Sequence, residues 1–447
     1  MFYKHISTKG LSMLLVHRIV VFVLIGLLPI PAMAADDDLL QLLNMLKDSN
    51  SLNQKQYQVM ITAIEDKDHG NEDDVVMVSS QGGLKLSSYD GQFSFELGGR
   101  LMIDMAVYQE DTVTLGNGTE LRRARLEAEG VIYSNWGYEL GVDFAGADVE
   151  VKDAYIEYLG KFDSSTKMGQ FKEPFSLEEL TSSNYITFME RALPNEFAPG
   201  RNIGIGLTHL GESWTVAYGL FAEAFDDDVA DEGDEGWGVT ARFTYAPWHE
   251  DRKALHMGVA LSQRTPDDDN TVKFDSRPES HITDVKYLDT GDIMEVDRVT
   301  VYGLEAALVL GSMSLQAELI NAQVARTGGL DDLGFSGGYV YGSWFLTGES
   351  RIYKHSKGSF GRINPVTDAG AWELALRLST LDLNDLDISG GKTDQLTLGI
   401  NWYVNPRLRY MLNFVKVDND LAADGGAPVV AGDDDPEIIQ IRAQIDF

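Results

Sequence analysis

The C-terminal stretch of this chain alternates strictly between apolar and polar side chains. Ile439, Ile441, Ala443, Ile445 and Phe447 fall on one face, and Gln440, Arg442, Gln444 and Asp446 fall on the other. A period of two predicts a strand with one dry and one wet face. At roughly 9–11 residues, such a strand is long enough to cross a bilayer when it is tilted. A soluble β-sandwich can also end on a strand like this, so the preceding residues must decide between the two.

The composition excludes several classes of protein. The formal net charge of −34 argues against nucleic acid as a partner, because phosphate binding requires clustered positive charge. The chain has no cysteine, which excludes disulfides and thiol chemistry and fits passage through an oxidising compartment.

The N-terminus indicates export. Lys4, Lys9 and Arg18 precede an apolar run over residues 19–30, and the run ends in Pro31-Ala32-Met33-Ala34. This pattern predicts a secretory signal over residues 1–34, with Met13 as an alternative start. The apolar run is too short for a spanning helix, which needs about twenty residues. Any membrane crossing must therefore use strands.

Residues 35–74 form the helical part of the sequence. Leu39, Leu42, Leu43 and Leu46 recur at helical spacing, and a charged linker follows. We expect a short periplasmic helical segment here. It either rests on the main domain or self-associates as a small coiled coil.

Residues 75–447 are predicted to form the main domain, and their pattern is β throughout. The expected strands are 93–108, 121–133, 136–145, 149–159, 167–172, 202–210, 214–224, 237–246, 254–264, 298–310, 312–326, 336–347, 371–383, 395–404, 407–417 and 437–447. An even count with alternating short and long connections is typical of outer-membrane barrels. The fold class is therefore all-β, a transmembrane antiparallel β-barrel of about sixteen strands. Segment 348–370 breaks the pattern, because it is long where a short turn is due; either that rim carries an excursion or the local count is wrong.

Several motifs resemble one known family. They are Leu121-Arg122-Arg123-Ala124-Arg125-Leu126, Gly169-Gln170-Phe171-Lys172-Glu173-Pro174-Phe175, Phe188-Met189-Glu190-Arg191-Ala192-Leu193-Pro194, Gly370-Ala371-Trp372-Glu373-Leu374-Ala375 and Gly399-Ile400-Asn401-Trp402-Tyr403. Their order is similar to that in the phosphate-selective porins O and P. The resemblance implies a homotrimeric sixteen-stranded porin in the outer membrane of a Gram-negative bacterium. It also implies a third outer loop folded inward, an arginine-lined constriction, and lipid, lipopolysaccharide and small anions as partners.

The candidate inward loop is the constriction loop, about residues 173–201. It is bent by Pro174, Pro194 and Pro199, and its many apolar residues must pack against a wall. We expect Arg191 and Arg201 near the narrowest point. Alternatively, they pair with Glu190 and Glu196 and only hold the loop.

Basic side chains on the polar strand faces are the candidate pore lining. They are Arg100, Arg123, Arg125, Lys172, Arg242, Arg377, Arg409 and Arg442. Rings of Arg and Lys create a path for anions, and the planar guanidinium suits phosphate. Carboxylates share these faces. Simple hairpin pairing would place Asp104 opposite Arg125 and Arg100 opposite Glu129, so cross-strand pairs can neutralise part of the positive charge.

Enzymatic signals are absent from the sequence. It contains no Gly-x-Ser-x-Gly elbow, no phosphate loop and no histidines at metal-ligand spacing, so we expect no catalysis, cofactor or metal. His256 is the only strand histidine on a polar face, and it has no evident partner. The acidic loops either bind divalent cations at the cell surface or stay solvated.

The sequence therefore predicts a passive channel for small hydrophilic solutes, with anions such as phosphate or polyphosphate preferred. One alternative is a general or weakly cation-preferring porin. A second is a structural or adhesion barrel with a blocked lumen, and a third is an outer-membrane hydrolase.

Overall fold

The computed structural model of the chain describes residues 47, 76–79, 83–146, 149–160, 163–224, 234–421 and 432–447. The chain divides into two compact units, residues 1–74 and 75–447. The predicted export signal and almost all of the predicted helical segment lie outside the described residues. The fold reported below is that of the second unit. No helix among the described residues is long and apolar enough to cross a membrane.

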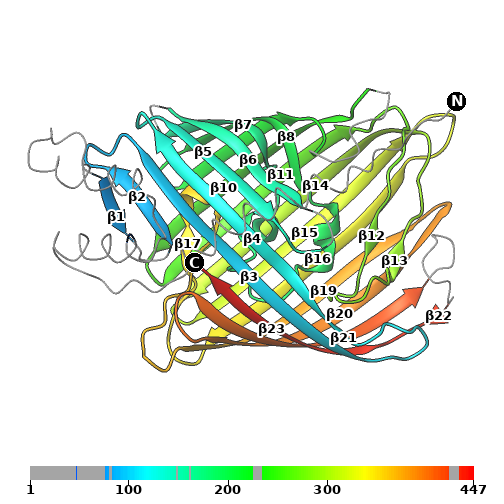
Figure 1. Ribbon diagram of the computed structural model, residues 1–447. Helices are drawn as coiled ribbons and strands as arrows, with labels where there is room; N and C mark the ends of the chain where they lie inside the picture. Colours follow the sequence, from blue (N-terminus) through cyan, green and yellow to red (C-terminus); the bar gives the residue numbers. More distant parts are fainter. Residues whose placement is uncertain are drawn as a thin grey trace, which may run out of the picture. The chain divides into compact units, whose positions relative to one another are not determined.

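Sixteen antiparallel strands close into a barrel (Figure 1). They are β3 (Ser94–Gln109), β4 (Gly118–Ile132), β5 (Trp136–Asp143), β6 (Glu150–Leu159), β7 (Ser164–Lys172), β8 (Arg201–Leu210), β9 (Trp214–Phe221), β10 (Trp237–Glu250), β11 (Lys253–Thr265), β14 (Val296–Leu310), β15 (Met313–Arg326), β16 (Leu333–Phe345), β19 (Ala371–Asp385), β20 (Ile388–Tyr403), β21 (Leu408–Leu421) and β23 (Glu437–Asp446). This confirms the predicted fold class and strand number.

The barrel closes where the terminal strand β23 lies beside β3, the first barrel strand (Figure 1). Arg442 pairs in register with Asp104, and the last bonds of the seam join Gly99 and Phe447, N to O, at 2.9 and 3.0 Å. A Cβ at Gly99 would lie 2.8 Å from Phe447 Cζ, so the terminal ring occupies the space that a side chain would fill. Closure leaves no unpaired edge at this seam. Beyond it, β2 (Leu84–Ser88) continues the pairing with β3, and β1 (Val76–Ser79) pairs with β2.

Alternation sorts the side chains between the outer and inner faces of the wall. On β14 and β15, Leu304 and Leu319 are each 57% exposed on the outside, whereas Glu305 and Glu318 are buried inside. Apolar side chains outside and polar side chains inside are the pattern of a barrel whose solvent is lipid.

One rim has short turns and the other carries most of the long connections. Short turns of the first rim are residues 133–135, 211–213, 251–252, 311–312 and 404–407. At the opposite rim, one expected connection is wrong. The sequence predicted a loop between residues 383 and 395, but β19 and β20 pair as far as Asp385–Ile388. The polar, glycine-containing residues there resemble a loop, yet they extend the hairpin into water, where apolar side chains are not needed.

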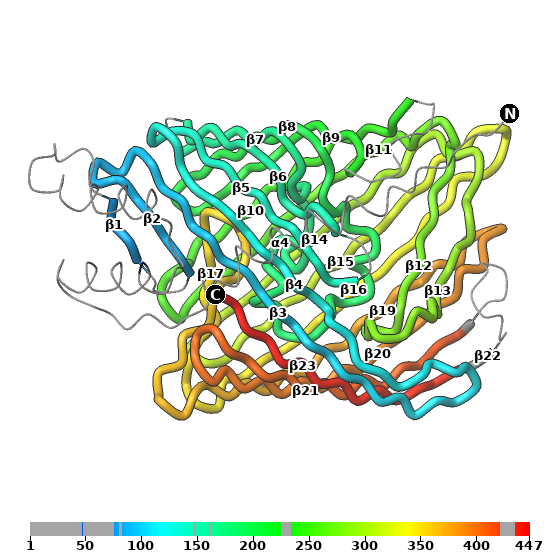
Figure 2. Tube along the Cα trace, viewed as in Figure 1, coloured from blue at the N-terminus to red at the C-terminus, as the bar shows by residue number. Residues whose placement is uncertain are grey.

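Three connections fold into the barrel. The constriction loop spans residues 173–200 and contains α4 (Leu177–Leu180) and η3 (Leu193–Phe197); the tube in Figure 2 traces its course. The connection over residues 266–295 contains β12 (Asp275–Ser276) and β13 (Leu288–Asp289). The third, here named the short-rim loop, spans residues 346–370 and contains β17 (Tyr353–Lys354), η4 (His355–Lys357) and β18 (Ser359–Phe360). Segment 348–370 is thus an excursion, not a missed pair of strands. A two-residue strand, β22 (Gly432–Asp433), pairs with β21.

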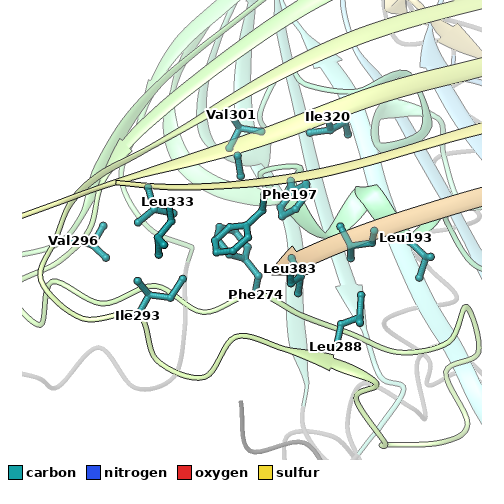
Figure 3. Packing of buried hydrophobic residues seen from close by; sticks show 14 of the residues in the cluster. Leu193, Phe197, Phe274, Leu288, Ile293, Val296, Val301, Ile320, Leu333 and Leu383 are labelled. Carbon is teal, nitrogen blue, oxygen red and sulfur yellow. The ribbon is translucent and has the colours of Figure 1, made fainter. Parts of the chain in front are cut away.

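An apolar cluster fills the interior on the side of β14–β19 (Figure 3). Phe197 of the constriction loop lies 5.3 Å from Phe274 of the 266–295 connection, and Phe274 lies 5.7 Å from Phe335 of β16, ring centre to ring centre. These edge-to-face contacts join two inward connections to the wall. The space available to solutes is therefore displaced toward β3–β9.

Candidate functional site

Two cavities follow each other along the inside of the barrel. The inner vestibule, about 730 Å³, is lined mainly by β3–β9 and the constriction loop. The outer vestibule, about 410 Å³, is lined by Arg122, Glu190, Arg277, His281 and Lys286 among others. Arg123 and Arg191 line both cavities. These two residues therefore stand at the junction of the vestibules.

A β-bulge places two adjacent arginines at this junction. Met102 pairs with Arg123 and Ile103 pairs with Leu121, so Arg122 has no partner on β3. Alternation predicts that Arg122 faces lipid, but the bulge turns it inward beside Arg123. Arg122 is therefore a site residue that the alternation pattern by itself does not reveal. An Arg that faces lipid at the bilayer midplane would destabilise the barrel by about 2–4 kcal/mol. That cost is the signal in the sequence that Arg122 faces inward.

Arg122 and Arg442 hold the tip of the constriction loop through Glu190. Arg122 donates to both oxygens of Glu190, at 2.9 and 3.0 Å, and Arg442 Nη2 donates to Oε1 at 2.7 Å. Burial opposes the charge on this carboxylate, but the two guanidinium groups hold the pKa of Glu190 well below its usual value. Arg442 also binds Asp104, at 2.6 and 2.7 Å.

The predicted cross-strand pairs are wrong, by four residues at Arg100 and by five at Asp104. Arg100 lies opposite Arg125, not Glu129, and Asp104 lies opposite Glu120, not Arg125. A simple hairpin count puts the middle of the turn between β3 and β4 near residue 114. In the structure β3 ends at Gln109 and β4 begins at Gly118, so the turn is centred earlier and the facing residues of β4 are shifted. Neutralisation still occurs, through other partners.

Arg123 is the exception among the basic residues of the junction. Its side chain is 5% exposed, and its Nη1 lies 3.5 Å from Met102 Sδ. No carboxylate of the described residues lies within 4.0 Å of its guanidinium, and its Nε has no hydrogen-bond partner among them. A buried guanidinium without a counter-ion favours an anionic ligand.

Lys172 and Arg191 share one carboxylate in the constriction loop. Lys172 Nζ lies 2.6 Å from Glu179 Oε1, and Arg191 Nε lies 3.2 Å from Oε2. Arg191 also donates to the main-chain oxygens of Glu178, Glu179 and Thr181, each at 3.1 Å. Burial would raise the pKa of Glu179, but Arg191 and Lys172 outweigh it and lower the pKa to about 2.

The other predicted cations of the inner vestibule are paired. Arg125 binds Asp143 and Arg201 binds Asp153, each with a 2.6 Å contact, and Arg242 binds Glu305 at 2.7 Å. Arg100 binds Glu127 and donates to Ser183 Oγ at 3.0 Å. The predicted partners of Arg191 and Arg201 were Glu190 and Glu196; the observed ones are Glu179 and Asp153.

Arg377, Arg409 and Arg442 lie on the inner face but behind the constriction loop. Their side chains are at most 2% exposed, and they donate to main-chain oxygens of that loop. Arg377 binds Glu190 O at 3.0 Å, Arg409 binds Ile186 O and Thr187 O at 2.7 and 2.9 Å, and Arg442 binds Met189 O at 2.5 Å. These three residues hold the loop and do not line either vestibule.

Further cationic side chains line the two vestibules from loops and turns. Strand alternation cannot predict which way these side chains point. Arg277 and Lys286 line the outer vestibule. Lys357, Arg362 and Arg407 line the inner vestibule. Their sequence positions give no signal, because a loop can turn a side chain toward the lumen or toward bulk water.

The expectation that His256 lacks a partner is wrong. Its Nδ1 lies 2.7 Å from Tyr353 Oη, and its Nε2 lies 3.1 Å from Glu305 Oε1. The ring therefore joins the short-rim loop to the wall. Among the described residues, no group of three or more metal-ligating side chains is present.

Three comparisons place this geometry among known proteins. Residues 95–447 match the family model described as phosphate-selective porin O and P. The chain is 29% identical to Porin O of Pseudomonas aeruginosa over 418 residues, covering 83% of this chain and 92% of that protein. It is 32% identical to an uncharacterised protein of Caulobacter vibrioides over 381 residues, covering 80% and 75%. The fold is similar to that of OmpT, an outer membrane protein of Vibrio cholerae, with a TM-score of 0.52, 12% identity, and 80% and 98% of the two chains covered.

Proposed function

The chain belongs to the phosphate-selective porin O and P family, and on that premise we propose that it conducts small anions, with phosphate or polyphosphate as the substrate class. It is an outer-membrane porin of a Gram-negative bacterium, and members of this family are channels, not enzymes.

The observation that carries the proposal is the unpaired guanidinium of Arg123 at the junction of the two vestibules. This group and Arg191 line both vestibules. In a narrow, low-dielectric passage a fixed cation lowers the energy of an anion and raises that of a cation. The planar fork of arginine also binds two oxygens of one phosphate at once.

The charges around the junction also favour anions over cations. Arg122, Lys172, Arg191 and Arg442 share three carboxylates (Asp104, Glu179 and Glu190), and Arg123 adds a charge that no carboxylate of the described residues pairs. This unpaired positive charge is local. The net charge of −34 for the whole chain includes acidic connections at the rim and does not set the potential here.

Reversal potentials across a planar bilayer under a salt gradient test the proposal. We expect anions to carry most of the current in the wild type, Arg123→Lys to keep that preference and Arg123→Glu to lose or invert it. Lys416→Glu is the control, because Lys416 is exposed on the outer face of β21. A wild type that passes mainly cations, or an Arg123→Glu variant that behaves like the control, would refute the assignment.

One observation favours a weakly cation-preferring pore as the second candidate. Glu96, Glu129 and Glu139 lie opposite one another in register on three adjacent strands of the inner vestibule. Such a row attracts cations near the short-turn rim. If it dominates, Glu129→Gln will shift the reversal potential more than Arg123→Glu does.

We also propose that the barrel assembles as a homotrimer through its short strands. Strands β5–β9 have 8–10 residues, whereas the barrel strands β10, β11, β14, β15, β16, β19, β20 and β21 have 13–16. A spanning strand needs about 9–11 residues, so the wall is lowest in the β5–β9 sector and gains most from cover by another copy. Because the chain lacks cysteine, single substitutions can map this face: Leu140→Cys should cross-link between copies, and Leu304→Cys on the long strands should not. The reverse result would place the contact elsewhere.

The N-terminal assignments remain part of the proposal. We propose that residues 1–34 are removed on export and that residues 35–74 form a periplasmic helical segment. A mature protein that begins at Ala35 is the expected result of N-terminal sequencing.

A further inference from the structure

A polar hollow of about 620 Å³ lies on the outer wall of the barrel, away from the passage. It is formed mainly by outward-facing residues of β11, β14, β15 and β16, together with Asp332 of the connection before β16. The side chains that give it its chemistry are Gln263, Arg298, Thr300, Tyr302 and Gln323. The small residues Ala325 and Gly334 also line the hollow.

Strand register fixes the height of the hollow on the wall. Gln263, Thr300, Gln323 and Gly334 form one row across the four strands. The next row toward the short-turn rim contains Leu261 and Tyr302, and the row after that contains Val259, Leu304 and Leu319. The outward side chains of these lower rows are largely apolar and exposed. The hollow therefore sits at the margin of the apolar belt, on the long-loop side.

That margin is the headgroup level of the outer leaflet. Short turns mark the periplasmic rim of a bacterial barrel and long loops mark the external rim. Acyl chains contact the apolar rows, so a polar hollow immediately above them faces lipid headgroups. In the Gram-negative outer membrane the external headgroups are those of lipopolysaccharide, a phosphorylated and acylated glucosamine disaccharide.

The side chains that line the hollow can bind each chemical group of such a headgroup. The guanidinium of Arg298 is half exposed, and its ion pair with adjacent Asp297, at 3.3 Å, is a surface pair that contributes little. It is available for a phosphate, which arginine binds bidentately. The amides of Gln263 and Gln323 and the hydroxyl groups of Thr300 and Tyr302 can bond sugar hydroxyl groups and amides.

We propose that this hollow binds the phosphorylated glucosamine headgroup of an outer-leaflet lipopolysaccharide molecule, with Arg298 on a phosphate and the acyl chains along Val259, Leu304 and Leu319. Asp332 also lines the hollow, and its charge repels a bare phosphate. The divalent cations that accompany these headgroups neutralise it, so Mg²⁺ strengthens binding. The site is separate from conduction and does not depend on the ion preference of the pore.

Binding of diphosphoryl lipid A to the folded, detergent-solubilised protein, in the presence of Mg²⁺, tests the proposal. Loss of a charge-assisted bidentate contact should weaken binding roughly tenfold in Arg298→Glu. Thr300→Trp, which fills the hollow without changing its charge, should weaken binding as well. Lys416→Glu, a charge reversal on the outer face of β21, is the matched control and should leave affinity unchanged.

Three results would overturn the site. The first is equal affinity of Arg298→Glu and Lys416→Glu. The second is unchanged affinity of Thr300→Trp, which would leave only a diffuse surface charge. The third is equal binding of phosphatidylglycerol or of dephosphorylated lipid A, which would remove the phosphorylated sugar as the recognised group. Single-channel conductance of the same variants should match the wild type, so failure here is distinguishable from failure of the anion-pore assignment.

Discussion

The two loops that enter the barrel from opposite rims are held in different ways. The constriction loop, from the long-loop rim, is fixed by fully buried arginines that bind its main-chain oxygens and carboxylates. The short-rim loop is fixed by one buried arginine of the wall and otherwise by neutral or partly exposed contacts. Arg242 bonds Gly358 O at 2.8 Å, Tyr353 bonds His256 at 2.7 Å, and the partly exposed Arg362 binds Asp446.

This difference follows from what each loop must do. The constriction loop carries Glu179, Glu190 and Arg191 at the junction, where a displacement of the carboxylates would change the charge that an ion meets. Buried charge pairs fix such positions, because breaking one leaves an uncompensated charge. The short-rim loop contributes Lys357 and Arg362 to the wider inner vestibule. Its position affects the local potential less.

The largest effect should come from removing a buried anchor. Arg442→Met leaves Asp104 and Glu190 without their shared partner, and breaking a buried pair costs about 3–5 kcal/mol. We expect a lower midpoint of denaturant unfolding and noisy single-channel current as the loop tip moves. A stability equal to that of the wild type would show that Arg442 does not anchor the loop. The double variant Arg442→Met/Asp104→Asn should recover part of the loss.

Acidification should loosen the constriction loop, because it protonates Glu179. Its pKa is lowered from 4.5 to about 2, so its stabilising contribution is fully present above about pH 4.5 and is lost as the pH falls through about 2. The contribution is on the order of 3 kcal/mol, an upper estimate for a buried group. Quiet channel traces at pH 4 that become noisy toward pH 2 are the expected result. In Glu179→Gln this pH dependence should be absent, and persistence of the transition would assign it to another carboxylate.

The short-rim loop should respond less to loss of its hydrogen bond to the wall. Tyr353→Phe removes the bond to His256 and should cost about 0.5–1.5 kcal/mol. Hydrogen exchange of the amides of residues 353–360 should become faster, while exchange in the constriction loop stays unchanged. Faster exchange in both loops would mean that they move as one unit.

The smallest effect should come from Arg351→Met, which makes the same exchange as Arg442→Met but within the short-rim loop. The Nη1 and Nη2 atoms of Arg351 have no hydrogen-bond partner among the described residues. An apolar side chain of similar size should therefore leave the unfolding midpoint nearly unchanged, with loss of the cation–π contact to Phe360 worth about 1 kcal/mol or less. A loss as large as that of Arg442→Met would remove the contrast between the loops.

Several features of the site followed from the residues alone. Alternation identified the barrel, its closing strand and the inner face that carries Arg100, Arg123, Arg125 and Arg242. Alternation failed at Arg122, because a single extra residue in β4 inverts the face between Leu121, which is exposed on the outside, and Arg123, which is buried on the inside. It also could not separate Arg123, which lines the junction, from Arg377 and Arg409, which the constriction loop covers. All three stand on the polar face, and only the loop decides which one a solute meets.

The short-rim loop shows a second limit. Its sequence is polar, as a solvent-exposed loop would be, and the inside of this barrel is polar as well. Composition therefore cannot distinguish a loop in bulk water from one inside the lumen.

The sequence by itself determined that this chain is an exported, strand-spanning barrel, because lipid demands a period-two pattern with all backbone groups paired, and that pattern is local. Only the tertiary structure decided where the narrow point lies and which cation there lacks a counter-ion. Those properties arise because Arg122 and Arg442 bind Glu190 from distant parts of the chain while Arg123 is left without a carboxylate partner among the described residues. No local pattern encodes the register and the loop path that bring them together.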